Sequence, residues 1–143
     1  MNKRKELTMD KLREYLDKKN IHPSYHRLKI LKYLMEHKTH PTVDMIYKDL
    51  SKEIATLSKT TIYNTLSLFL KEGIISCLTI DENKIMYDYN TKPHVHFICI
   101  KCGCVYDIHL KCPIFDKEII EGHKITEYHI YLKGICKECL KNA

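Results

Sequence analysis

The chain has 143 residues, of which 44% are hydrophobic and 29% charged, and its formal net charge is +6. This length fits one globular domain or two very small ones, and no apolar run approaches the roughly 18 residues that span a bilayer. The charged N-terminus is not followed by the apolar stretch of a signal peptide, so we expect a cytoplasmic protein with no membrane partner. In that compartment its seven cysteines are more often metal ligands or buried thiols than disulfides.

Basic residues are concentrated at the start of the chain. Residues 1–29 hold nine Lys or Arg against four Asp or Glu. Such an excess suits a polyanionic partner such as DNA, although a solvated charged face is the commoner meaning of this bias. The charge alone therefore leaves both interpretations open.

Apolar residues at helical spacing predict four helices in the first part of the chain. Ser24, Thr42 and Ser58 stand where N-caps of the second, third and fourth helices are expected. Gly73 follows the last periodic residue and is expected to end the fourth helix.

Two alternating stretches, residues 74–80 and 84–90, come next and flank the turn signal Asp81, Glu82 and Asn83. This pattern predicts a two-stranded wing. Helices followed by a wing indicate a winged-helix DNA-binding domain over residues 1–89. A small helical domain with a solvated polar face would show the same periodicity.

The fourth helix has the character of a recognition helix. With Ile62, Leu66 and Phe69 facing inward, its first turns would present one cation and several hydrogen-bonding side chains outward, namely Lys59, Thr60, Thr61, Tyr63, Asn64 and Ser67. A helix in the major groove contacts bases and phosphates through its N-terminal half, where carboxylates would be repelled. Double-stranded DNA is therefore the expected partner.

Residues 90–93, which end in Pro93, predict a hinge linker. Beyond it, residues 94–143 read as strand, strand, a short helix over 113–121 closed by Gly122, and a strand over 125–132. The predicted fold class is α+β, with a winged-helix domain followed by a small α/β domain. A unit this small usually needs a metal, disulfides or a partner subunit to hold it together.

Two C-x-x-C pairs offer that staple, and we expect a structural Zn²⁺ bound by Cys99, Cys102, Cys136 and Cys139. A thioredoxin-like motif would need only one pair beside a βαβ pattern, which is not visible here. The remaining cysteines, Cys77, Cys104 and Cys112, are expected to be small buried hydrophobes or spare thiols.

A second metal is suggested by His94 and His96, which share one face of a predicted strand while Cys99 lies on the other. Asp107 on the next strand and Asp88 in the wing could add carboxylates. Two histidines on a strand are more often surface residues with satisfied hydrogen bonds than metal ligands. Both interpretations of this pair therefore remain open.

The order of these motifs resembles the ferric uptake regulator (Fur) superfamily over essentially the whole chain. The resemblance rests on the winged helix, the H-P-T segment at residues 40–42, T-I-Y at 61–63, H-x-H-x-x-C-x-x-C at 94–102 and the terminal C-x-x-C. It implies a homodimeric repressor with a C-terminal dimerisation domain, a structural zinc and a regulatory metal at the hinge. More narrowly, the chain is similar to the peroxide-responsive, PerR-like branch.

That narrower resemblance rests on aspartate at both carboxylate positions and on Asn64 after Tyr63, where iron-sensing relatives tend to carry glutamate and arginine. It implies a regulatory site for Fe²⁺ or Mn²⁺ formed by His40, Asp88, His94, His96 and Asp107. It also implies that peroxide oxidises His40 or His94 in the iron form. The family's T-x-Q-R appears here as Ser24 to Arg27 with His26 in place of glutamine, which weakens a DNA contact carried over to that segment.

Alternative functions share the same fold. An iron-responsive or zinc-responsive repressor would use the same ligands without their oxidation. An enzyme is not expected, because the chain has no H-E-x-x-H motif and a zinc bound by four thiolates has no open position.

Overall fold

A computed structural model describes residues 8–37, 40–81 and 84–142. It divides the chain into two compact units, Met1–Thr91 and Lys92–Ala143. The division falls inside the 90–93 segment that was expected to be the linker. Within the described ranges, no helix is both long and apolar enough to cross a membrane.

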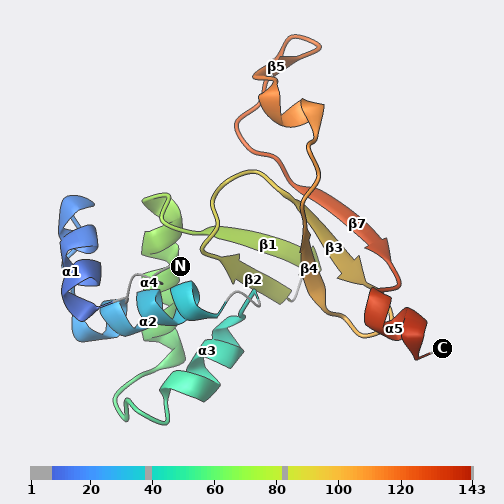
Figure 1. Cartoon of the computed structure of the whole chain (residues 1–143). Helices are drawn as coiled ribbons and strands as arrows, with labels where there is room; N and C mark the ends of the chain where they lie inside the picture. Colours follow the sequence, from blue (N-terminus) through green and yellow to red (C-terminus); the bar gives the residue numbers. More distant parts are fainter. Residues whose placement is uncertain (1–7, 38–39, 82–83, 143) are drawn as a thin grey trace, which may run out of the picture. The chain divides into compact units, whose positions relative to one another are not determined.

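The first unit begins with four helices (Figure 1), which are α1 (Met9–Lys18), α2 (Tyr25–Glu36), α3 (Val43–Leu50) and α4 (Lys59–Lys71). The predicted N-caps are confirmed, since the hydroxyl oxygens of Ser24, Thr42 and Ser58 each accept a backbone N–H three residues further on. Each cap satisfies a donor that the first helical turn leaves unpaired. The local sequence therefore sets where these helices begin.

Gly73 ends α4 as predicted. It adopts a left-handed φ of +69°, and the N–H of Ile74 donates to the carbonyl of Phe69 at 2.9 Å while the N–H of Gly73 donates to that of Leu70 at 3.1 Å. These two bonds form a Schellman motif. The apolar face of α4 points inward, where Ile62, Leu66 and Phe69 are fully buried.

The predicted wing is also present. Strand β1 (Ser76–Asp81) pairs antiparallel with β2 (Lys84–Asp88), and Ser76 lies opposite Asp88. Glu82 and Asn83 of the predicted turn lie outside the described residues. The first unit is thus a winged-helix domain.

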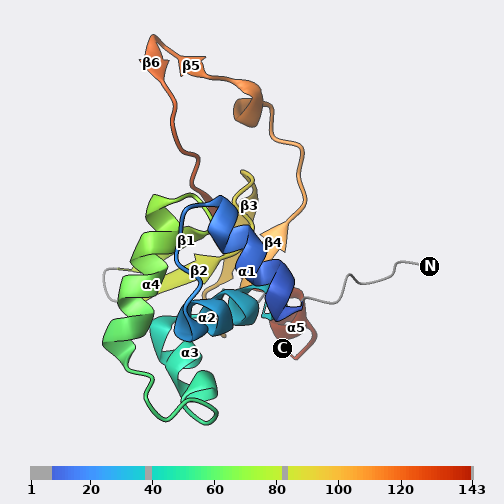
Figure 2. The same cartoon turned by 90° about the vertical axis from the view of Figure 1, so that its left-hand side faces the viewer.

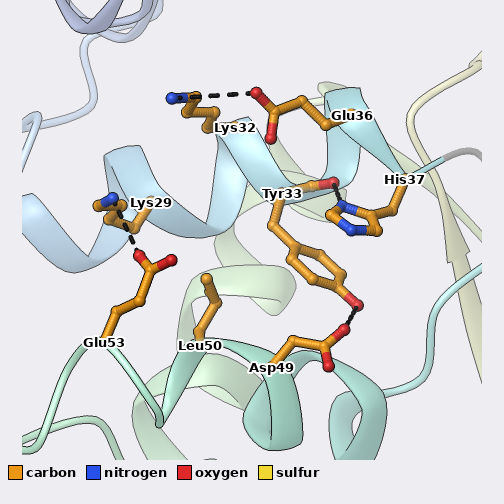
Figure 3. Close-up of a pocket in the computed structure, with 8 residues that line it drawn as sticks. All are labelled: Lys29, Lys32, Tyr33, Glu36, His37, Asp49, Leu50 and Glu53. Atoms are coloured by element: carbon orange, nitrogen blue, oxygen red, sulfur yellow. Dashed lines mark hydrogen bonds and ion pairs between the residues drawn. The ribbon is translucent and has the colours of Figure 1, made fainter.

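Helices α2 and α3 are joined by polar contacts around a surface pocket of about 250 Å³ (Figure 3). The Tyr33 hydroxyl donates to Asp49 Oδ2 at 2.6 Å. The His37 ring stacks on the Tyr33 ring at 3.9 Å, and its Nδ1 lies 2.9 Å from the Tyr33 carbonyl. Lys29 pairs with Glu53 at 3.2 Å at the rim. The Tyr33–Asp49 bond therefore joins α2 to α3, and the Lys29–Glu53 pair joins α2 to the turn that follows α3.

The second unit is a three-stranded sheet in the order β4-β3-β7. Strand β3 (Val95–Cys99) pairs antiparallel with β4 (Val105–Ile108) and parallel with β7 (Ile130–Gly134). A short helix, α5 (Lys137–Lys141), follows β7. It was not predicted, and the Cys136 side chain caps it by accepting the Cys139 N–H.

The predicted helix over residues 113–121 is wrong. One 3₁₀ turn, η1 (Pro113–Asp116), is followed by a small hairpin of β5 (Ile119–Ile120) and β6 (His123–Lys124), at the tip of an extended arm in Figure 2. Glu121 and Gly122 both have positive φ, +51° and +84°. This is the two-residue turn that matches strand twist. Gly122 therefore closes a hairpin and does not end a helix.

Candidate metal centres

Four cysteine sulfurs converge in the second unit. Cys99 lies at the end of β3, Cys102 in the turn after it, and Cys136 and Cys139 around the start of α5. Their Sγ atoms all lie within 4.8 Å of one another, and the Cys99–Cys139 and Cys102–Cys136 separations are both 3.8 Å. A tetrahedron with Zn–S bonds of about 2.3 Å has edges of about 3.8 Å. The donor set and spacing therefore fit a tetrahedral Zn²⁺.

Backbone hydrogen bonds prepare two of these sulfurs to be thiolates. The Cys102 N–H donates to Cys99 Sγ at 3.4 Å, and the Cys136 N–H donates to it at 3.3 Å. These bonds favour the thiolate more than burial disfavours it, so they lower the pKa of Cys99 to about 6. The Cys139 N–H lowers the pKa of Cys136 in the same way. For Cys102, the Cys104 N–H lowers the pKa, but the thiol of Cys99 and burial raise it to about 12. Metal binding would therefore displace protons from the remaining thiols.

Tyr106 on β4 is a neighbour of this cluster that the sequence did not reveal. Its hydroxyl hydrogen-bonds to Cys136, and this bond, together with burial, raises the pKa of Tyr106 to about 12 while it lowers that of Cys136. Tyr106 pairs with Phe97 in the sheet. This register places Tyr106 on the same face of the sheet as Cys99. Strand alternation alone does not predict it, because alternation does not specify which residues of β3 and β4 pair.

A second group of ligands lies on the opposite face of the same sheet. The Nε2 atoms of His94 and His96 lie 3.2 Å and 3.4 Å from one oxygen, Asp107 Oδ1. Neighbouring ligand atoms about 2.1 Å from a metal are separated by about 3.0 Å in an octahedron and about 3.4 Å in a tetrahedron. The arrangement fits three ligands of one ion, and it follows from the pairing of His96 with Asp107 across β3 and β4.

The His94 ring is oriented by its other nitrogen. Its Nδ1 lies 2.7 Å from the Lys92 carbonyl, and a carbonyl oxygen can only accept, so Nδ1 carries the proton. In the neutral ring Nε2 then carries the lone pair, and Nε2 is the nitrogen that faces Asp107. Hydrogen bonds of this kind fix the tautomer of metal-binding histidines.

The first unit holds a histidine and a carboxylate of the same character. His40 Nε2 lies 3.3 Å from Asp88 Oδ2, and their side chains are 3% and 11% exposed. The N–H of Tyr87, next to Asp88, donates to the Pro41 carbonyl at 2.9 Å, so wing strand β2 is tied to the segment that carries His40. His40 has a left-handed φ of +56°, a conformation that costs a non-glycine residue about 1–3 kcal/mol and gathers at functional sites.

The candidate DNA-contacting side chains lie on the first turns of α4. Lys59, Thr60, Tyr63, Asn64 and Ser67 are exposed, whereas Thr61 is half-buried, and its N–H and hydroxyl bond to Ser58 Oγ at 3.1 Å and 2.9 Å. Lys59 forms an ion pair, in which its Nζ lies 3.0 Å from a carboxylate oxygen of Asp44 on α3. The outward face therefore has a carboxylate beside its cation, which the sequence pattern of α4 did not indicate.

The other three cysteines divide between the two expected alternatives. Cys77 is partly buried and packs against the hydrophobic core of the first unit. Cys104 is exposed and Cys112 is partly exposed, so both fit the alternative of spare thiols.

Comparison with known proteins extends these observations. The model of the ferric uptake regulator family matches residues 18–133. The peroxide-responsive repressor PerR of Staphylococcus epidermidis is 36% identical over 118 residues, which cover 79% of this chain and 77% of that repressor. The relative from Staphylococcus aureus strain USA300 with the same name is 37% identical over 117 residues, which cover 79% and 78%.

Solved structures show the same likeness. The ferric uptake regulator of Francisella tularensis, determined with iron, has a TM-score of 0.67 and 28% identity, and the match covers 82% of this chain and 92% of that one. PerR of Streptococcus pyogenes, solved in work on peroxide sensing and gene regulation, has a TM-score of 0.52 and 29% identity, with 92% of each chain covered.

Proposed function

Since the chain belongs to the ferric uptake regulator family of metal-dependent DNA-binding repressors, we propose that it represses transcription as a homodimer and senses hydrogen peroxide through a bound Fe²⁺ ion. The observation that carries the proposal is the donor set. Nitrogen and oxygen ligands in two small groups are suited to Fe²⁺ or Mn²⁺, and the four thiolates are suited to Zn²⁺.

Cys99, Cys102, Cys136 and Cys139 would hold the structural Zn²⁺. The regulatory ion would be shared by His40 and Asp88 of the first unit with His94, His96 and Asp107 of the second. With these five residues as its ligands, the ion could also bind peroxide. The 3.3 Å separation of His40 from Asp88, and the 3.2 Å and 3.4 Å separations around Asp107, support this assignment, because each matches neighbouring ligands of one ion.

Bound Fe²⁺ would supply an electron to hydrogen peroxide, whereas Mn²⁺ would occupy the same ligands without that reaction. His40 and His94 are the side chains that we expect to take up oxygen. Each is held close to a carboxylate at the site, and neither could leave without loss of the chelate. Oxidation of either imidazole would remove a ligand permanently and so release the repressor from DNA.

Metal binding would change the affinity for DNA by restricting the angle between the two units. An ion bound by ligands from both sides of the 90–93 segment restricts that angle. The recognition helices of a dimer must match half-sites spaced by whole turns of DNA. If the ion favours this match, metal and DNA each strengthen the binding of the other. Exposed apolar residues of the second unit, including Leu110, Leu132 and Leu140, support dimerisation through that unit.

The proposal is tested by Asp88→Ala, with DNA duplexes selected from a random library by the Mn²⁺-loaded protein. Fluorescence anisotropy should show that the variant loses Mn²⁺-dependent DNA binding, while mass spectrometry under native conditions shows an intact zinc content and dimer. Asp17→Ala, an exposed aspartate on α1, is the matched control and should bind as the wild type does. Tight binding by metal-free Asp88→Ala would contradict the proposal.

A further inference from the structure

A fifth thiol lies beside the four cysteines that are proposed to bind zinc. Cys104 follows Cys102 after a single residue, and both are exposed, whereas Cys99 and Cys136 are buried. The turn that contains Cys102 and Gly103 ends at Cys104, whose carbonyl accepts the Cys99 N–H, and both the N–H and the thiol of Cys104 are close enough to affect the pKa of Cys102. Of the four proposed zinc ligands, Cys102 is therefore the one that combines solvent access with a spare thiol close by.

The backbone explains why the two side chains lie together. The Cys99 N–H donates to the Cys104 carbonyl at 3.0 Å, and the Gly103 N–H donates back to the Cys99 carbonyl at 2.9 Å. These bonds close a tight turn in which Gly103 adopts a left-handed φ of +77°, a conformation that glycine takes without steric cost. Cys102 and Cys104 flank this glycine, and a disulfide between them would leave the β3–β4 pairing in place.

We propose that Cys102 and Cys104 form an oxidation site at which hydrogen peroxide converts the exposed zinc thiolate into a disulfide and so releases the structural zinc. This inference rests on the proposed zinc ligation. It concerns a second response to peroxide, separate from oxidation of the histidines.

The reaction balances as two steps. The Cys102 thiolate attacks one oxygen of hydrogen peroxide, the O–O bond breaks, and the second oxygen leaves as hydroxide, so that Cys102 becomes a sulfenic acid. Cys104 Sγ then attacks the Cys102 sulfur, an S–S bond forms, and the S–O bond breaks with loss of water. Two thiols lose two electrons, and one peroxide is reduced to two waters.

Formation of the disulfide removes Cys102 as a ligand and leaves zinc with three protein ligands. A unit of this size depends on such a staple, so the dimerisation domain should loosen when zinc leaves. A disulfide is reversed by thiol exchange, whereas oxidised histidine is not restored in this way. The oxidation site would thus add a reversible response to the irreversible one.

The test uses the full chain loaded with zinc alone, so that no iron chemistry contributes. Hydrogen peroxide is added, and zinc release is followed with a chromogenic chelator. Free thiols are then alkylated and the protein is digested with trypsin. Cleavage after Lys101 and Lys111 gives peptide 102–111, which contains both cysteines and no other. The expected product is this peptide with no alkyl group and two hydrogens fewer.

Cys104→Ser should release zinc at least about fivefold more slowly, because the other nearby thiols are themselves zinc ligands and resolve the sulfenic acid less readily. Cys112→Ser removes a spare thiol outside the turn and should match the wild type. Equal release rates for Cys104→Ser and wild type would overturn the inference. So would a disulfide joining peptide 102–111 to the peptide that carries Cys99 or Cys136.

Failure of the zinc assignment itself would be recognised separately. If the purified protein contains no zinc by elemental analysis, the proposed ligation is wrong. A disulfide within peptide 102–111 of that protein would still support the pairing of Cys102 with Cys104, and its absence would reject the pairing.

Discussion

His94, which precedes β3, and His96, which lies in β3, both approach Asp107. One of its oxygens faces both His94 Nε2 and His96 Nε2. In the proposed site this carboxylate neutralises charge and sets the spacing of the two imidazoles. Its contribution should therefore exceed that of an ordinary surface aspartate.

Replacement of Asp107 with asparagine keeps the shape of the side chain and removes its charge. We expect the affinity for Mn²⁺ to fall by at least about tenfold, the scale found when groups that support metal ligands are changed, while zinc content stays unchanged. Electron paramagnetic resonance titration of free Mn²⁺ measures this affinity. Asp116→Asn, at an exposed position in η1, is the control. Unchanged Mn²⁺ affinity in Asp107→Asn would remove this residue from the site.

Single residues also show which features of the fold and of the candidate site the sequence could predict. The caps Ser24, Thr42 and Ser58 depend on neighbours within three positions, so they were predicted correctly. Tyr106 reaches the zinc cluster only through the pairing of β3 with β4. That register is a long-range property, and no nearby residue signals it.

At the scale of elements, one buried tyrosine joins α2 to α3 by a hydrogen bond. Tyr33 is 4% exposed, and burial and its hydrogen bond to Asp49 raise its pKa above the usual 10.0. The raised pKa means that this group stabilises the folded state fully below pH 10.0 and loses that contribution as the pH rises toward its folded-state pKa.

Tyr33→Phe should lower the free energy of unfolding by about 1 kcal/mol at neutral pH, since it removes the hydrogen bond to Asp49. The difference from wild type should shrink above pH 10.0, where unfolded tyrosine ionises. Urea denaturation followed by circular dichroism at both pH values measures it. Tyr25→Phe, at a position that is 55% exposed, should change little at either pH. A difference that is the same at both pH values would contradict the assignment.

The arm of the second unit shows how one pattern can fit two structures. Ile119, Ile120 and Gly122 were read as the end of a helix, but they form a hairpin closed by Glu121 and Gly122. Short apolar runs with a glycine suit either element. Two β-branched residues before a two-residue turn favour the hairpin.

At the scale of the whole molecule, the proposed regulatory site draws its ligands from both units. The order of motifs along the chain predicted the winged helix, the meeting of the two C-x-x-C pairs and the family. Strand alternation predicted that His94 and His96 share a face, whereas His40 was expected only through the resemblance to the family. In the proposed function the arrangement of the units depends on the ion and on DNA, and neither is encoded in a local pattern.

The central claim is that Fe²⁺ at this site directs peroxide onto a ligand histidine. The most direct measurement loads the protein anaerobically with Fe²⁺ or Mn²⁺, adds stoichiometric peroxide briefly, and locates added oxygen by fragmentation of tryptic peptides. His40 lies in peptide 39–48 and His94 in peptide 85–101. Met45, which is 40% exposed, lies in the first peptide and reports non-specific oxidation.

We predict added oxygen on His40 or His94 in the iron form alone, with Met45 modified to the same small extent in both forms. Loss of DNA binding should follow the fraction of oxidised histidine. Histidines that stay intact in the iron form would contradict peroxide sensing, and they would indicate an iron-responsive or zinc-responsive repressor on the same fold.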